Sequence, residues 1–305
     1  MRVWVTGGAG FVGSHICDRL LIEGHQVDAI DDMSSGDLSN LSGARRHGDF
    51  TFHQIDVRRP ELVDLARRQR PEAIIHAAGY LERPGSLHSP REDTDVNIGS
   101  LLAVLAAARD VNARRVVAVV HATPDTTDPP HTPAEVNAWT VVDHLRIHQE
   151  QGWLDTVAAV VSNVYGPRQM VDDQGPLVAR MVRQATLGLP LPVQGSGEQV
   201  RDLVYVDDAV SAIVSCLAAE PGSVIPVGSG TTISVNEVAE AVAAACGRDL
   251  DLVYEPARMP DVNRLAWPTG VAMSLLRWAA WTDFEDGLSD VVADWHGRLL
   301  KRPEV

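Results

Sequence analysis

The sequence predicts a doubly wound α/β fold, in which a parallel sheet carries helices on both faces. Six short apolar runs alternate with helix-length segments through the first half of the chain, and this alternation is typical of parallel strands joined by helices. A glycine-rich turn follows the first apolar run. The chain has 305 residues, of which 45% are hydrophobic and 22% are charged, so it can build a large core in one or two domains.

The predicted elements follow from local patterns along the chain. The strands are short and largely apolar, as expected where both faces of a sheet are covered. They are expected at residues 3–6, 26–30, 51–55, 73–76, 116–120 and 157–161. Helical patterns occur near residues 11–23, 60–70, 94–110 and 134–151 and, in the second half of the chain, near 207–219 and 234–246.

The regular alternation loosens after about residue 165, where prolines and glycines become frequent. We expect residues 1–165 to form the domain that contains the sheet, with part of the chain near 200–230 returning to it. Residues 166–305 are expected to form mainly a smaller domain over the carboxyl ends of the strands, where such sheets bind ligands.

Composition and charge exclude several classes of partner. The net charge of −15 argues against binding to nucleic acid or to an anionic membrane surface. No run of about 18 uncharged apolar residues occurs, so no membrane span is expected. The chain starts directly with a predicted strand rather than a signal peptide, and its three cysteines lie far apart. We therefore expect a cytoplasmic protein whose cysteines are buried and unpaired.

The turn after the first predicted strand has the spacing of a dinucleotide-binding site. Gly7, Gly10 and Gly13 form the pattern G-x-x-G-x-x-G between a strand and a helix. The first glycine permits a tight turn, the second lets the backbone approach a pyrophosphate, and the third lets the helix pack closely. The helix N-terminus offers free N–H groups to phosphates. We therefore expect Gly7, Gly10, Phe11, Val12 and Gly13 to hold the pyrophosphate of a dinucleotide.

A carboxylate ends the second predicted strand. Asp31 lies at the distance from the glycines at which a side chain accepts hydrogen bonds from both hydroxyls of a ribose. A carboxylate there repels a 2′-phosphate, so NAD is favoured over NADP as the cofactor. The alternative interpretation is that Asp31 and Asp32 form a turn or a capping pair.

Residues after the third and fourth predicted strands extend the expected cofactor site. Asp56 and Val57 follow the third strand, which places an acid near the adenine edge. Small residues follow the fourth strand, where they let a dinucleotide lie close to the backbone. These residues are Ala77, Ala78 and Gly79.

These motifs and later ones resemble the extended short-chain dehydrogenase/reductase family, in its branch of NAD-dependent nucleotide-sugar epimerases and dehydratases. The resemblance covers essentially the full length of the chain. It implies a Rossmann fold with a smaller C-terminal α/β substrate domain, an NAD cofactor, a nucleotide-sugar substrate, and a homodimer formed through the helices at 94–110 and 134–151. The motifs that carry it are residues 7–15, Asp31 with residues 33–36, Asp56 with Val57, and residues 76–78, 163–168 and 195–208.

The resemblance also implies roles for single residues. Arg201 matches an arginine that grips the substrate diphosphate, Arg258 matches a second such arginine, and Asn163 matches an asparagine of the substrate pocket. A guanidinium group suits a diphosphate. Arg201 has an alternative role in a salt bridge with Asp202 or Asp207, and Arg258 has an alternative structural role. On the cofactor side, the further implied contacts are Asp32, Ser34, Ser35, Gly36 and Asn97.

The chain departs from the family at the residues that perform the chemistry. Family members use a Tyr-x-x-x-Lys pair, in which the tyrosine exchanges a proton with the sugar while the lysine holds the nicotinamide ribose and lowers the tyrosine pKa. Here the single lysine is Lys301. The aligned positions are Ala134 and Ala138, or Glu135 and Trp139 in the neighbouring register, so neither register supplies the pair.

Three residues are candidates for the missing proton transfer. His121 lies at the end of the fifth predicted strand, and imidazole has an ordinary pKa of about 6.5. The alternative for this residue is a structural histidine bonded to the backbone. Thr123 lies two residues further on, and Tyr80 follows the loop on the cofactor side. His144 and His148 have the spacing of a metal pair without a third ligand nearby, so we expect an exposed polar helix face and no metal.

Three interpretations of the function remain open at this stage. The first is an NAD-binding, epimerase- or dehydratase-like enzyme that acts on a nucleotide sugar or a similar polar substrate through atypical acid/base groups. The second is a catalytically inactive NAD-binding sensor or partner subunit. The third is a conventional nucleotide-sugar 4-epimerase with an unrecognised proton-transfer residue. The missing pair argues against standard hydride chemistry, because losing a positioned acid/base group costs about 10²–10⁴-fold in rate.

Overall fold

The computed structural model describes residues 1–79, 89–121, 132–171, 175–257 and 266–301. Its contacts divide the chain into two compact units. The first, called the sheet unit below, comprises Met1–Val161, Val210–Val227 and Gly270–Trp278. The second unit comprises Ser162–Ala209, Gly228–Thr269 and Ala279–Val305.

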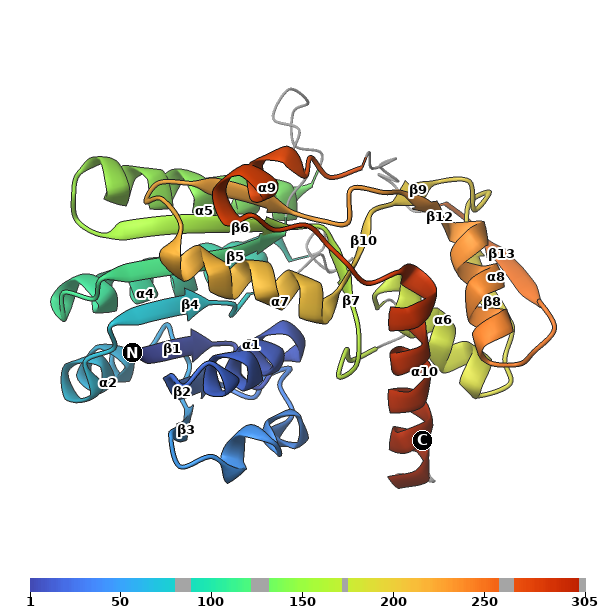
Figure 1. The fold of residues 1–305 in the computed structure, drawn as a ribbon, viewed down its shortest axis with the longest axis horizontal. Coiled ribbons are helices and arrows are strands. Elements are labelled where there is room, and N and C mark those ends of the chain that lie inside the picture. Colours follow the sequence, from blue (N-terminus) through green and yellow to red (C-terminus); the bar gives the residue numbers. More distant parts are fainter. Residues whose placement is uncertain (80–88, 122–131, 172–174, 258–265, 302–305) are drawn as a thin grey trace. The chain divides into compact units, whose positions relative to one another are not determined.

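The sheet unit is built on a seven-stranded sheet with the order β11-β6-β5-β4-β1-β2-β3 (Figure 1). Each strand pairs in parallel with its neighbours. The direction of the strand order reverses between β1 and β4, which is the point where doubly wound sheets bind ligands. The predicted doubly wound fold is therefore confirmed. The strands are β1 (Arg2–Thr6), β2 (Gln26–Asp31), β3 (Phe50–Gln54), β4 (Ala73–His76), β5 (Arg115–His121), β6 (Asp155–Val161) and β11 (Val224–Val227).

Helices cover both faces of this sheet, and Figure 1 shows α1 and α7 on one face and α4 and α5 on the other. None of the helices in the described part of the chain is long and apolar enough to span a lipid bilayer. The helices are α1 (Phe11–Ile22), α2 (Glu61–Gln69), α3 (Pro90–Thr94), α4 (Ser100–Asp110), α5 (Pro133–Glu150) and α9 (Gly270–Leu276), with a π-helix η4 (Asp95–Gly99), 3₁₀ turns η1 (Leu38–Leu41), η2 (Ala44–Arg46) and η5 (Cys216–Ala218), and α7 (Val206–Ser215), which runs from the second unit into the sheet unit.

The start of α5 is fixed by a capping box. The Thr132 hydroxyl accepts a hydrogen bond from the backbone N–H of Glu135, and the Glu135 carboxylate accepts one from the backbone N–H of Thr132. Pro133 occupies the first helical position, where its missing N–H costs no hydrogen bond. These local signals place the first turn of α5, which carries Ala134.

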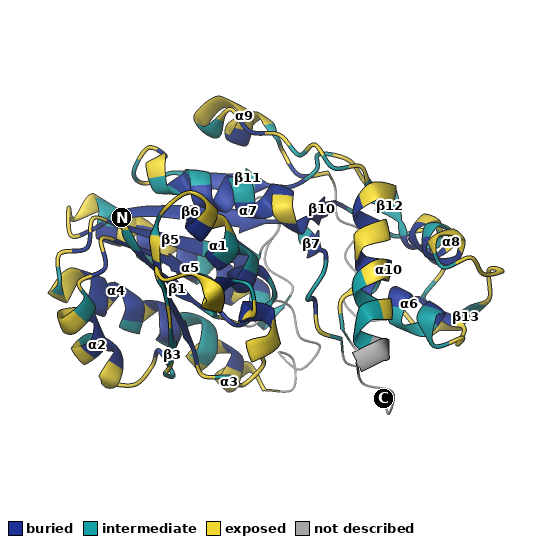
Figure 2. Cartoon of the chain, turned by 60° about the horizontal axis from the view of Figure 1, so that its bottom comes forward, coloured by how far each residue is buried: buried dark blue, intermediate teal, exposed yellow. Residues whose placement is uncertain are grey.

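Apolar side chains from the strands and helices form the core of the sheet unit. Trp4 and Ile74 on the strands are fully buried, as are Ile16 on α1 and Leu101 on α4. The same pattern is visible in Figure 2, where the central strands are dark blue. Burying an apolar side chain of this size contributes about 1.5–3 kcal/mol. The core thus holds the strand ends, and the loops that leave them, in place.

The second unit consists of short strand pairs and helices. β7 (Asn163–Tyr165) pairs in parallel with β10 (Leu203–Tyr205), β8 (Leu191–Gln194) pairs in parallel with β13 (Leu252–Glu255), and β9 (Val200–Arg201) pairs antiparallel with β12 (Ile233–Ser234). The helices of its described part are α6 (Leu177–Thr186), α8 (Val235–Ala245) and α10 (Phe284–Lys301).

A buried carboxylate organises the loops of the second unit. Oδ1 of Asp202 accepts hydrogen bonds from the Ser162 hydroxyl and from the backbone N–H and hydroxyl of Ser229, at 2.8–3.1 Å. Its Oδ2 accepts hydrogen bonds from the backbone N–H groups of Gly230 and Trp267, at 2.9 and 2.8 Å. A buried carboxylate with this many donors is well satisfied. Asp202 therefore has a structural role in this unit.

Candidate functional site

The turn between β1 and α1 excludes side chains at two of its glycines. Gly7 has a φ of +70°, and a Cβ there would lie 2.7 Å from the backbone oxygen of Ala77. A Cβ on Gly13 would collide with the backbone oxygen of Gly7. Gly10 is the N-cap of α1 and has no side chain to cap the helix. No capping side chain therefore covers the backbone N–H groups of the first helical turn, and an anion can reach them.

Asp31, at the end of β2, holds the glycine turn. Its Oδ2 accepts a hydrogen bond from the backbone N–H of Ala9 at 3.0 Å, and its Oδ1 accepts one from the N–H of Met33 at 2.8 Å. Burial raises the pKa of this carboxyl, an effect that the two backbone hydrogen bonds oppose. Each oxygen keeps a lone pair for a further donor. Asp32, in contrast, accepts a hydrogen bond from Ser34 N–H at 2.8 Å within its own loop.

An arginine that we did not identify from the sequence grips Asp56. The Arg58 guanidinium donates to both carboxylate oxygens of Asp56, from Nε and Nη2, each at 2.9 Å. Its Nη1 donates to Asp95 at 2.7 Å, at the start of the π-helix η4. These hydrogen bonds lower the pKa of Asp56. Asp56 is therefore an ionised carboxylate that can only accept hydrogen bonds, and Arg58 links it to Asp95 of η4.

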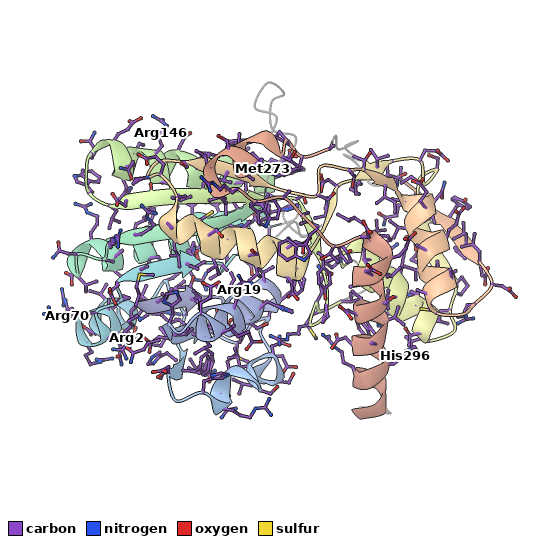
Figure 3. All side chains as sticks on the ribbon, viewed as in Figure 1. Arg2, Arg19, Arg70, Arg146, Met273 and His296 are labelled. Atoms are coloured by element: carbon purple, nitrogen blue, oxygen red, sulfur yellow. The ribbon has the colours of Figure 1, made fainter. Side chains whose placement is uncertain are left out.

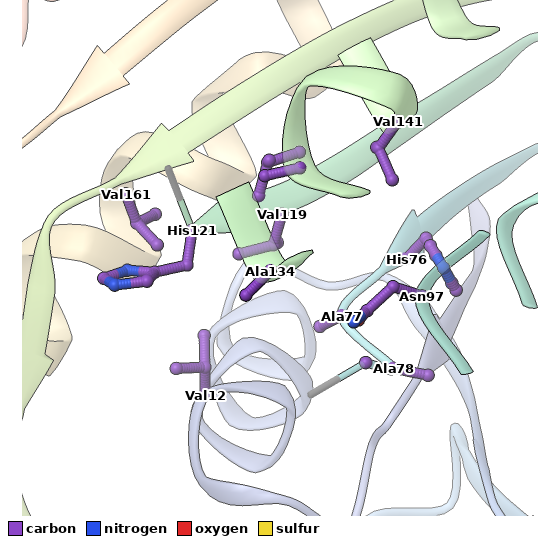
Figure 4. A pocket seen from close by; sticks show the side chains of 13 residues that line it. Val12, His76, Ala77, Ala78, Asn97, Val119, His121, Ala134, Val141 and Val161 are labelled. Carbon is purple, nitrogen blue, oxygen red and sulfur yellow. The ribbon is translucent and has the colours of Figure 1, made fainter. Parts of the chain in front are cut away.

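A cavity of about 60 Å³ lies where β4, β5 and β6 end, beside the N-terminus of α1 and the first turns of α5 (Figure 4). Most of its wall is apolar, and its polar side chains are His76, Asn97 and His121. In Figure 4, His121 and His76 lie on opposite sides of the view with Ala134 between them. The residues that line it are Val12, His76, Ala77, Ala78, Gly79, Asn97, Val119, Val120, His121, Ala134, Ala138, Val141 and Val161.

The wall on the side of α5 carries the methyl groups of Ala134 and Ala138, the residues of the first register expected from the sequence. Ala134 and Ala138 are one helical turn apart and both line the cavity. In the neighbouring register, Glu135 is buried in the capping box of the helix. Of the two registers expected from the sequence, only the one with Ala134 and Ala138 has both of its positions in the cavity lining.

Asn97 lies on the π-helix η4, a wide helical turn of a kind that often occurs at functional sites. A Cβ on Gly79 would lie 2.8 Å from Oδ1 of Asn97, so the Asn97 side chain approaches the backbone at this glycine closely. The structure therefore brings Asn97 against the loop that follows β4, in the same cavity as Ala77 and Ala78.

Other predicted residues lie elsewhere. Tyr80, Thr123 and Arg258 fall outside the described residues. In the second unit, Asn163 at the start of β7 donates from Nδ2 to the backbone oxygen of Asp202 at 3.1 Å. Arg201 in β9 is half-buried and donates from Nη1 to the backbone oxygen of Val200 at 2.8 Å. Asp202, which the sequence suggested as a salt-bridge partner of Arg201, accepts hydrogen bonds from loops of the second unit.

The prediction of an exposed face for His144 and His148 is wrong. His148 is buried, its ring packs edge-on against Trp153 at 5.3 Å between centroids, and its Nδ1 lies 2.8 Å from the backbone oxygen of His144. His144 is half-buried. The reason is helical spacing, because His148 falls on the buried stripe of α5 with Val141 and Leu145. No group of histidine, cysteine and acidic side chains that could hold a metal ion occurs among the described residues.

Comparison with known proteins identifies the family of the chain. A profile of the NAD dependent epimerase/dehydratase family matches residues 3–228. The UDP-glucose 4-epimerase of Mycolicibacterium smegmatis is 32% identical over 305 aligned positions, which cover 96% of this chain and 97% of that protein. UDP-glucuronic acid decarboxylase 1 of Xenopus tropicalis is 27% identical, with coverage of 95% of this chain and 71% of that protein. The crystal structure of UDP-glucose 4-epimerase from Thermus thermophilus in complex with NAD matches with a TM-score of 0.89 at 28% identity, covering 97% of this chain and 99% of that one.

The family profile covers most of the chain, and the mycolicibacterial relative aligns over nearly its whole length. The resemblance found in the sequence motifs is thereby confirmed at the level of family and fold. The chain belongs to the NAD-dependent epimerase/dehydratase family, an enzyme family whose cofactor is the one predicted for the glycine turn.

Proposed function

We propose that this protein is an enzyme that binds NAD in the sheet unit and acts on a nucleotide-activated sugar through proton-transfer groups other than a Tyr-x-x-x-Lys pair. The observation that carries the proposal is the cavity wall on α5. Ala134 and Ala138 contribute only methyl groups there, and the imidazole of His121 lines the same cavity. A titratable group is thus present where the usual acid/base pair is missing.

The residues of the sheet unit fit an NAD molecule. The backbone of Gly7, Gly10 and Gly13, where a Cβ at the first or last would collide with backbone atoms, would take the pyrophosphate. Asp31 would accept the ribose hydroxyls with its free lone pairs. Asp56 would accept from the adenine amino group. When bound, NAD supplies a hydride acceptor at its nicotinamide ring. The residues that would contact the cofactor further along are Phe11, Val12, Asp32, Ser34, Ser35, Gly36, Val57, Ala77, Ala78, Gly79 and Asn97.

His121 is the proposed acid/base group. It ends β5 and lines the cavity beside Val161. Imidazole titrates near neutral pH, so it can both accept and donate a proton at a sugar hydroxyl. Thr123 follows β5 in the sequence and Tyr80 follows β4. Both are proposed to assist in this proton transfer.

The substrate is proposed to be a nucleotide sugar held by the second unit. The relatives described above are named for UDP-glucose and UDP-glucuronic acid. Arg201 and Arg258 would grip the diphosphate, because a guanidinium fork pairs with phosphate oxygens in two hydrogen bonds. Asn163 would line the sugar pocket.

We further propose a homodimer formed through α4 and α5. Leu102 on α4 is 41% exposed, and Val136 and Ile147 on the outer face of α5 are 48% and 41% exposed. Arg146 (labelled in Figure 3) precedes Ile147 on α5 and pairs with Glu150 at 2.9 Å. An apolar stripe with charged neighbours is typical of a helix-bundle interface. Light scattering on the purified protein measures the oligomeric state.

The alternative function is a non-catalytic NAD-binding sensor or partner subunit. The same apolar wall favours it, because Ala134 and Ala138 supply no proton-transfer group to the cavity. A conventional 4-epimerase with an unrecognised acid/base residue is the third interpretation.

Product analysis separates an enzyme from a non-catalytic sensor. The NAD-loaded protein is incubated with a panel of UDP-hexoses and UDP-uronic acids, products are resolved by chromatography, and NADH is followed by its near-ultraviolet absorbance. A converted nucleotide sugar supports the proposed enzyme. Tight NAD binding with no product and no NADH for any member of the panel favours the sensor.

A further inference from the structure

Three buried polar side chains of the sheet unit are linked by hydrogen bonds into a chain beside the cavity, and the middle one, His76, lines it. Thr6 ends β1, His76 ends β4 and Ser100 begins α4, and their exposed fractions are 0%, 4% and 2%. Thr6 Oγ1 lies 2.7 Å from His76 Nδ1, and Ser100 Oγ lies 3.2 Å from His76 Nε2. The imidazole therefore bridges two hydroxyl groups that come from different parts of the chain.

Both ends of this chain continue to the backbone of cavity residues. The backbone N–H of Ala78 donates to Thr6 Oγ1 at 3.4 Å. The Ser100 hydroxyl donates to the backbone oxygen of Asn97 at 3.4 Å. Ala78 and Asn97 both line the cavity. The loop after β4 and the π-helix η4 are thus joined through His76.

One protonation pattern satisfies every member of the chain. Thr6 accepts from Ala78 and donates its hydroxyl hydrogen to Nδ1 of His76. The Nε2–H of His76 donates to Ser100, and Ser100 donates to Asn97. In the other tautomer, Nδ1–H donates to Thr6, and the Thr6 hydroxyl hydrogen then lacks an acceptor among the described residues. The hydrogen bond made by one ring nitrogen sets the role of the other. The hydrogen bonds from Ala78 through Thr6, His76 and Ser100 to Asn97 therefore all donate in the same direction.

Burial keeps this histidine neutral. Removal of the ring from water lowers the pKa of His76 to about 4, with no charged neighbour as a cause. A neutral imidazole is the form that can both accept and donate. Leaving the two buried hydroxyls without it would cost the desolvation of each.

We propose that His76 is a positioning residue, held neutral as its Nε2–H tautomer, that sets Ala78 and Asn97 for the nicotinamide end of NAD. This inference relies on the proposed function for the placement of that end of the cofactor in the cavity. The tautomer itself does not depend on that placement.

The binding test uses His76→Leu, which keeps the size of the side chain and removes both hydrogen bonds. Affinities for NAD and for AMP, which lacks the nicotinamide half, are measured by calorimetry. The dissociation constant for NAD should rise about tenfold, as expected for about 1.4 kcal/mol of lost hydrogen bonding, while that for AMP changes less than about twofold. His148→Leu is the matched control, because it removes a buried histidine of α5 that does not line the cavity; it should leave both affinities unchanged.

Two further measurements guard against a variant that fails to fold. Ser100→Ala removes the hydrogen bonds of the Ser100 hydroxyl with His76 Nε2 and with the backbone oxygen of Asn97, and leaves the one between His76 and Thr6. It should raise the dissociation constant for NAD about threefold without changing that for AMP. Long-range ¹⁵N NMR on the unmodified protein reports the tautomer of His76 directly, and we expect the proton on Nε2 at neutral pH.

Several results would overturn the inference. Equal losses for NAD and AMP would make His76 a merely structural residue, and an Nδ1–H tautomer would contradict the direction of the chain. Unmodified protein that binds NAD no better than AMP would refute the placement of the nicotinamide end, and the positioning role with it. Absence of turnover combined with the expected affinity pattern would instead refute only the proposed enzymatic activity.

Discussion

The two ends of the proposed cofactor site differ in the kind of residue that they present. At the adenine end, Asp31 and Asp56 are ionisable side chains held by hydrogen bonds from the backbone and a neighbouring arginine. At the nicotinamide end, Ala134 and Ala138 present methyl groups, with His121 in the same cavity. The residues proposed to bind the dinucleotide are thus different from those proposed to react beside it, so one set can change while the other is kept.

The largest expected effect concerns His121. His121→Ala should lower turnover of the converted nucleotide sugar about 10²–10⁴-fold, because a positioned acid/base group is lost. The dissociation constant for NAD should change less than about threefold, because His121 is not among the residues proposed to bind NAD. Steady-state kinetics and calorimetry measure the two quantities. His144→Ala, on α5 outside the cavity lining, is the control, and unchanged turnover in His121→Ala would remove this residue from the mechanism.

The next effect tests the close approach in the glycine turn. Gly13→Ala places a Cβ against the backbone oxygen of Gly7, whereas a Cβ on Gly48 meets nothing within 4 Å. Gly13→Ala should therefore lower the free energy of unfolding by about 2–3 kcal/mol, and Gly48→Ala should change it by less than about 0.5 kcal/mol. Denaturant unfolding of the cofactor-free protein measures both. Similar stabilities for the two variants would contradict the close approach.

Asp31→Ala probes the ribose contact. Loss of a charged acceptor for two hydroxyls should weaken NAD binding about 10–100-fold. Asp64→Ala on the exposed surface of α2 is the control and should bind NAD normally. The pH dependence has a definite sign, because burial raises the pKa of Asp31 and the ionised form is the better acceptor. NAD affinity of the unmodified protein should be constant above that pKa and fall as the pH drops through it. Full affinity in Asp31→Ala would refute the contact.

The smallest effect concerns the adenine edge. Arg58 lowers the pKa of Asp56, so in the proposed site an ionised Asp56 would accept a hydrogen bond from the amino group of adenine and repel the carbonyl oxygen of hypoxanthine. NAD should bind about tenfold more tightly than nicotinamide hypoxanthine dinucleotide. Asp56→Asn should remove this preference, while Asp95→Asn, which changes the other carboxylate on Arg58, should retain it. Competition binding with the two dinucleotides measures the ratio, and equal ratios in both variants would contradict the assignment.

Much of the sheet unit follows from local sequence signals. The apolar runs and the glycine spacing predict six of the seven strands and the turn at the switch point, because these features depend on neighbours in the chain. The strand β11 was not predicted. It contains Pro226, which interrupts the strand pattern, and it lies at the edge of the sheet, where a missing N–H is tolerated.

The site residues that were missed depend on contacts between distant segments. Arg58 reaches Asp95, and His76 reaches Thr6 and Ser100, across 24 to 70 positions of sequence. No local pattern reports such pairings. The burial of His148 could have been predicted locally, because it follows Val141 and Leu145 at helical spacing. We considered only its spacing from His144.

We propose that Ala134 and Ala138 on α5 are the reason why the proposed cofactor site lacks the family's usual proton-transfer pair. The most direct measurement is formation of NADH by the double variant Ala134→Tyr and Ala138→Lys, with NAD and the nucleotide sugar that the unmodified protein binds. We predict a rate at least about 10²-fold above that of the unmodified protein, as a restored acid/base group supplies. A double variant that binds both ligands with unchanged affinity and forms NADH no faster would contradict the claim.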